Sequence, residues 1–200
     1  MKRALISFLL LFLILAPAQS TAIAYSSDPE KFIGEIIDEA KIILSSQDSQ
    51  EAKAKKLSEI ALKTVDIKGL ANYTLGSKRK ELSSEETKKY EALFEKYFLK
   101  SFTSRLTDYS DPKISVLSAE VVSAKYTIVK TMLVATSKKP EVKIDWRVYT
   151  KDPNNPLIRD LIVEGLSLAR TQKEEFASIL SSNNNEINAL FKSLENFINK

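Results

Sequence analysis

Val142–Tyr149, with the sequence VKIDWRVY, alternates strictly between apolar and polar side chains. Ile144, Trp146 and Val148 therefore share one face of a strand, while Asp145 and Arg147 lie on the other. One covered face and one solvated face are typical of an antiparallel sheet. This stretch predicts an antiparallel sheet with a single face turned toward apolar surroundings.

Three neighbouring segments have a similar composition, rich in Val, Ile, Thr and Tyr. With the first stretch, the predicted strands are residues 114–122, 125–135, 142–149 and 157–164. Hairpin loops are expected at Lys138-Lys139-Pro140 and at residues 152–156, where Pro and Asn gather. We expect a curved antiparallel sheet of about four strands.

Helical periodicity precedes these strands. Asp28 followed by Pro29 predicts an N-cap with proline at the first helical position, and a second amphipathic helix follows. Asp66 is expected to cap a short third helix, Ile67–Leu75, which Gly76 would end in a left-handed conformation.

The longest predicted helix begins at Ser83 and extends to about Asp108. Ser83 and Glu86 have the spacing of a capping box, in which each side chain bonds the other residue's amide. Its apolar stripe is rich in rings, with Phe94, Phe98 and Phe102 on one face.

Helical periodicity returns after Ser167. Phe176 and Leu180 form an i, i+4 pair there, three Asn residues at 183–185 interrupt the pattern, and a last amphipathic helix follows. This order of elements, with helices before and after the strands, predicts one α+β domain over residues 25–200. The helices are expected to pack over the sheet.

Residues 1–24 have the order of a secretory signal peptide. Lys2 and Arg3 precede an apolar run, and Ala22-Ile23-Ala24 offers a cleavage site after Ala24, with an alternative after Ala18. The other interpretation is an uncleaved anchor, but the run is shorter than the roughly 20 residues that a membrane span needs. We therefore expect a mature, secreted protein beginning near Tyr25.

The composition narrows the possible chemistry. The chain has no His and no Cys, which excludes Ser-His and Cys-His nucleophiles and the usual zinc sites. Loss of Lys2 and Arg3 with the signal would lower the formal charge from +4 to +2, too balanced to indicate nucleic-acid binding. We expect no catalytic residue, no metal site and no cofactor.

Several segments, in order and with plausible spacing, resemble the MlaC family, also called toluene-tolerance auxiliary proteins. They are Val65-Asp66-Ile67, Tyr73-Thr74-Leu75-Gly76, the aromatic helix at 90–109, Asp145-Trp146-Arg147, DLIVEGLSL at 160–168 and FASIL at 176–180.

The resemblance implies a nuclear-transport-factor-like α+β fold with a deep apolar cavity between sheet and helices. In that family the cavity holds the acyl chains of a phospholipid, its cargo, and leaves the head group near solvent. The implied role is transport across the periplasm, between an outer-membrane lipoprotein complex and an inner-membrane ABC transporter complex with an MCE-domain partner. Such transport maintains outer-membrane lipid asymmetry.

The expected cavity wall combines the apolar strand faces with the ring-bearing helix faces. Its candidate lipid-binding residues are Phe94, Phe98, Phe102, Ile144, Trp146, Val148, Leu161, Val163, Phe176 and Leu180. Each of these side chains could instead belong to a closed core, as in a periplasmic interaction module without a ligand. The indole N–H of Trp146 needs a hydrogen-bond partner if it is buried.

An enzyme with a hydrophobic pocket is the alternative from another class. A ketosteroid-isomerase-like site would use an Asp with a Tyr, and Asp145, Asp160 and Glu164 are the carboxylates to consider. Asp160 and Glu164 are expected on one strand face, opposite Leu161 and Val163. We expect the three acids to pair instead with Arg147, Arg159 or Arg170, stabilising the sheet and the following helix start. A carrier of another lipid, such as a hopanoid, would have much the same sequence pattern.

Overall fold

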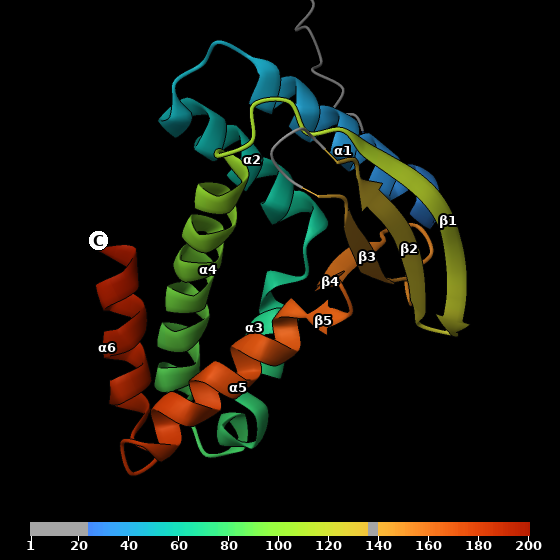
Figure 1. The fold of residues 1–200 in the computed structure, drawn as a ribbon. Coiled ribbons are helices and arrows are strands. Elements are labelled where there is room, and N and C mark those ends of the chain that lie inside the picture. Colours follow the sequence, from blue (N-terminus) through green and yellow to red (C-terminus); the bar gives the residue numbers. More distant parts are fainter. Residues whose placement is uncertain (1–23, 136–139) are drawn as a thin grey trace, which may run out of the picture.

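A computed structural model describes residues 24–135 and 140–200 (Figure 1). Residues 1–23 of the predicted signal peptide and the Lys138-Lys139 part of the predicted hairpin loop lie outside the described residues. The elements, in chain order, are α1 (Pro29–Ser45), α2 (Gln50–Thr64), α3 (Ile67–Leu75), the 3₁₀ helix η1 (Gly76–Lys80), α4 (Ser84–Leu106), β1 (Ile114–Ser123), β2 (Tyr126–Leu133), β3 (Val142–Tyr149), β4 (Leu157–Val163), β5 (Leu166–Ser167), α5 (Leu168–Ser181) and α6 (Ile187–Ile198). This order confirms the predicted α+β class.

The strands form one antiparallel sheet in the order β1-β2-β3-β4-β5. Irregular registers in β1 and between β3 and β4 bend the sheet, because a bulged strand carries an unpaired extra residue. α1 packs against β1 and β2, while α5 packs against β4. In Figure 1 the sheet curls on one side of the molecule, and α4 and α6 stand together on the other.

The end of β4 differs from the prediction. Glu164 was expected to continue the strand, but Glu164 (φ 49°) and Gly165 (φ 82°) form a two-residue turn that starts the fifth strand. Positive φ at both turn positions suits the right-handed twist of a tight hairpin. Glu164 therefore does not share a strand face with Asp160, and its carboxylate accepts a hydrogen bond from the Lys143 amide.

The predicted helix starts are confirmed. Asp28 accepts a bond from the Lys31 amide, at 2.9 Å, and the capping box of Ser83 and Glu86 opens α4. α4 ends at Leu106, two residues before the expected end. Local side-chain to backbone bonds define these starts, which is why short sequence patterns locate them.

Two buried clusters hold the layers together. One joins α3, α4, α5 and α6 around Tyr90, which is 0% exposed and whose hydroxyl lies 2.8 Å from the Thr74 hydroxyl. The other joins α1 and α2 to the sheet around Val129 and Val148. Val65 packs against both clusters, at the junction between the helical layer and the sheet.

Candidate functional site

A cavity of about 480 Å³ lies between the two clusters. Its wall comes from α1, α2, α3, α4 and α5 on the helical side and from β1, β2, β3 and β4 on the sheet side. Most of the lining is aliphatic or aromatic, as in sites that hold apolar ligands.

Seven of the ten predicted wall residues line this cavity. They are Phe94, Phe98, Phe102, Ile144, Trp146, Leu161 and Val163. The strand residues come together because Trp146 pairs with Leu161, and Ile144 with Val163, across the β3–β4 ladder. The three Phe side chains lie along one face of α4.

The rings of α4 stack along the helix. The Phe94 and Phe98 centroids are 6.3 Å apart at 21°, and those of Phe98 and Phe102 are 5.8 Å apart at 7°. Phe94 is buried, whereas Phe98 and Phe102 are only partly buried. All three rings line the cavity, and Phe94, the most N-terminal of them, also belongs to the buried cluster around Tyr90.

Three predicted wall residues, Val148, Phe176 and Leu180, lie outside the cavity lining. Val148 is 0% exposed in the cluster of α1, α2 and the sheet. Phe176 meets the Phe94 ring edge-on, at 6.3 Å and 88°, in the other cluster, which also contains Leu180. Side-chain periodicity identifies the face of an element, but the opposing element determines whether that face meets a core or a space.

The indole of Trp146 has the hydrogen-bond partner that its burial requires. Its Nε1–H donates to the Thr131 hydroxyl, at 3.0 Å, and that hydroxyl donates to the Ile144 carbonyl, at 2.8 Å. Thr131 is 1% exposed on β2. The bond fixes the indole against the sheet and satisfies its polar atom within the wall.

Polar side chains also line the cavity, and the sequence pattern did not identify them. The Tyr97 hydroxyl donates to Gln172 Oε1, at 2.6 Å. Burial raises the pKa of Tyr97 above its ordinary value, and the nearby carboxylate of Glu175 adds to the shift. Tyr97 therefore remains a protonated donor at neutral pH. Arg105 and Lys41 line the cavity as well.

The expected pairing of carboxylates with arginines is wrong. Asp160, 6% exposed, accepts bonds from the Ser167 hydroxyl, at 2.6 Å, and the Ala169 amide, at 3.0 Å. It does stabilise the start of α5, but without an arginine. Arg159 instead binds Asp66 at the start of α3, and Arg170 lies 3.5 Å from Glu174.

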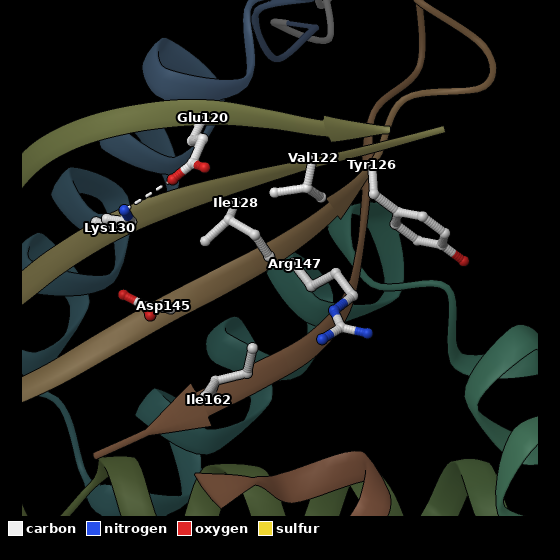
Figure 2. A pocket seen from close by; sticks show the side chains of 8 residues that line it. All are labelled: Glu120, Val122, Tyr126, Ile128, Lys130, Asp145, Arg147 and Ile162. Carbon is white, nitrogen blue, oxygen red and sulfur yellow. Dashed lines mark hydrogen bonds and ion pairs between the residues drawn. The ribbon is translucent and has the colours of Figure 1, made fainter. Parts of the chain in front are cut away.

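Asp145 lies on the opposite face of the sheet, in a shallow hollow of about 430 Å³ (Figure 2). Its surroundings there include Arg147, Lys130 and Glu120, and the last two form a 2.8 Å ion pair. Ions of both signs on a solvated sheet face are typical of an ordinary protein surface, where such pairs contribute little to stability. In residues 24–135 and 140–200, no cluster of acidic side chains could hold a metal ion.

The protein has an α+β fold in which helices cover a curved antiparallel sheet. The helices and the sheet enclose an apolar cavity, which is typical of proteins that bind apolar ligands. Residues 34–196 match the family model described as MlaC protein. The chain therefore belongs to the MlaC family, as its sequence motifs indicated.

The fold is similar to that of a phospholipid-binding protein from Ralstonia solanacearum, whose structure was determined in complex with a phospholipid. The TM-score is 0.70 at 16% sequence identity, and the match covers 88% of this chain and 97% of that one. No curated protein matches the sequence. Within the described part of the chain, no helix has the length and hydropathy needed to cross a bilayer.

Proposed function

We propose that this protein binds a phospholipid in the cavity and carries it through the periplasm. The observation that carries the proposal is the apolar cavity between the α4 rings and the β3–β4 face. Each buried methylene of an acyl chain contributes about 0.8 kcal/mol, so acyl chains can be held without specific polar contacts. Membership of the MlaC family and the phospholipid-bound structural neighbour support the same ligand class.

The finer part of the proposal concerns location and partners. The signal-like residues 1–24 support export to the periplasm. There the protein would exchange lipid with an outer-membrane lipoprotein complex and an inner-membrane ABC transporter complex with an MCE-domain partner, as family membership suggests. The cycle involves no covalent chemistry, so the protein would act as a carrier and not as an enzyme.

The direct test is to express the full chain, purify the protein from the periplasm and record native and denaturing mass spectra. We expect a mass corresponding to one bound phospholipid, released on denaturation, on a chain starting near Tyr25. A bound hopanoid or other lipid would change the cargo class. Protein recovered without any lipid, under conditions that retain lipid on a known carrier, would contradict the proposal.

A second prediction separates carrier from enzyme. Of the carboxylates of Asp145, Asp160 and Glu164, that of Asp160 lines the cavity, yet both of its oxygens accept hydrogen bonds at the start of α5. We expect Asp160→Asn to lower stability by about 1–2 kcal/mol while the folded protein keeps its lipid. Asp145→Asn, on the other sheet face, is the matched control.

The measurements are urea denaturation, lipid occupancy and isomerisation of a 3-oxo steroid followed by absorbance. The enzyme interpretation would be favoured if the wild-type protein isomerised the steroid, and if Asp160→Asn abolished this activity without changing the denaturation midpoint.

A further inference from the structure

Two cations line the cavity, and one of them lies where α4 terminates. Arg105 occupies the last turn of α4, and Lys41 lies on α1. Both side chains line the cavity, and their sequence neighbours Leu106 and Ala40 pack against the same buried cluster.

Arg105 continues the face of α4 that carries the rings. It follows Phe102 by three positions and Phe98 by seven, the spacing of residues on one helix face. Helical side chains lean toward the N-terminus, so the guanidinium is directed back along these rings. The positive charge of Arg105 offsets part of the rise in the pKa of Tyr97, which agrees with this direction.

Neither cation has a close carboxylate partner. Among the described residues, Arg105 forms no ion pair, and the Lys41 ammonium is 3.9 Å from Asp38, whose side chain is 77% exposed. By contrast, Lys56 and Lys130 hold carboxylates at 2.6 Å and 2.8 Å. Glu175 also lines the cavity, but it accepts a bond from Gln172 and is not paired with Arg105.

We propose that Arg105, assisted by Lys41, binds the phosphodiester group of the lipid held in the cavity. This inference rests on the proposed phospholipid binding and adds the position and orientation of the ligand. A guanidinium offers paired N–H donors that match phosphate oxygens, and Lys41 supplies a second positive charge. The phosphate then lies at the C-terminal end of α4, and the acyl chains extend along Phe102 and Phe98 toward Phe94, about 16 Å away along the helix.

The test compares delipidated wild-type protein with Arg105→Gln, Lys41→Gln and the double variant. Arg147→Gln, which removes an exposed cation from the opposite sheet face, is the matched control. Binding is measured to vesicles containing phosphatidylglycerol, to vesicles containing diacylglycerol with the same acyl chains, and to inorganic phosphate alone. Melting curves establish that each variant is folded.

We expect the double variant to bind phosphatidylglycerol about 10- to 100-fold more weakly while its diacylglycerol binding is unchanged. Added NaCl should weaken only the phosphatidylglycerol binding of the wild type, which tests the inference without any variant. Inorganic phosphate at millimolar concentration should not compete, because it lacks acyl chains.

Equal loss of both lipids in the double variant, or no loss of either, would overturn the inference while leaving phospholipid carriage intact. Competition by inorganic phosphate would identify a free-anion site and overturn it as well. A wild-type protein that binds neither lipid would instead overturn the proposed function.

Discussion

Val163→Trp is expected to displace bound lipid from an intact fold, whereas Val148→Trp is expected to disrupt the fold itself. Val163 lines the cavity and pairs with Ile144, so an indole there can occupy existing space. Displacing about four methylenes of acyl chain would cost about 3 kcal/mol, or roughly 100-fold in affinity. The melting temperature should change little.

Val148 provides the matched comparison because it has the same side chain but no adjacent space. It is 0% exposed and packed with Val129 and Ile158 beneath the helices. Overpacking of this kind typically costs about 1–3 kcal/mol and can be worse for so large an increase in volume. The sequence pattern alone treats these two valines as equivalent wall positions, and the structure separates them.

Both variants are examined by phospholipid-to-protein ratio after purification and by thermal denaturation. If Val163→Trp unfolds as readily as Val148→Trp, the space beside β4 is not open, and the cavity cannot serve as a lipid site. If Val163→Trp is stable and still retains a full complement of lipid, the cargo lies elsewhere.

Asp66→Ala is expected to destabilise the protein by about 2–4 kcal/mol, because one carboxylate both caps a helix and neutralises an arginine. One of its oxygens caps α3 by accepting the Gly69 amide, at 2.9 Å. The other accepts from Nε and Nη2 of Arg159, both at 2.6 Å. The change would remove a helix cap and leave a partly buried guanidinium without its counterion.

Arg159 extends this connection into the sheet. It donates to the Tyr126 hydroxyl, at 3.1 Å, and its guanidinium carbon lies 3.5 Å from the centre of the Tyr149 ring. The Asp66 amide also donates to the Ile158 carbonyl, at 2.9 Å. Asp66 therefore ties the start of α3 to three strands, so its loss affects the junction between the helical layer and the sheet.

Urea denaturation of Asp66→Ala measures this loss, with the exposed Glu120→Ala as a control that should change little. Gly69→Ala is an independent variant, because an added Cβ would lie 2.3 Å from Asp66 Oδ2. Gly-to-Ala changes inside helices ordinarily stabilise, so destabilisation at this position would show that the carboxylate position matters. A stability of Asp66→Ala equal to that of Glu120→Ala would contradict the assigned role.

Features that depend on neighbours along the chain could be predicted from the sequence. Asp28, Ser83 and Asp66 begin helices because their side chains reach amides three residues away. The alternation in Val142–Tyr149 fixed which strand face is apolar, and the order of the periodicities fixed the α+β class. These interactions require no knowledge of distant segments.

The surroundings of each apolar face depend on the packing of segments that are remote in the sequence. Val148 and Phe176 have the same periodicity as the wall residues, yet helices pack directly on them. Arg159 could have paired with any nearby acid, and its partner Asp66 is 93 residues away. Arg105 and Lys41 likewise line one cavity only because α1 and α4 both contribute to its wall. Periodicity predicts the direction in which each side chain points. Whether that side chain meets a packed core or a cavity depends on how closely segments remote in the sequence pack against it.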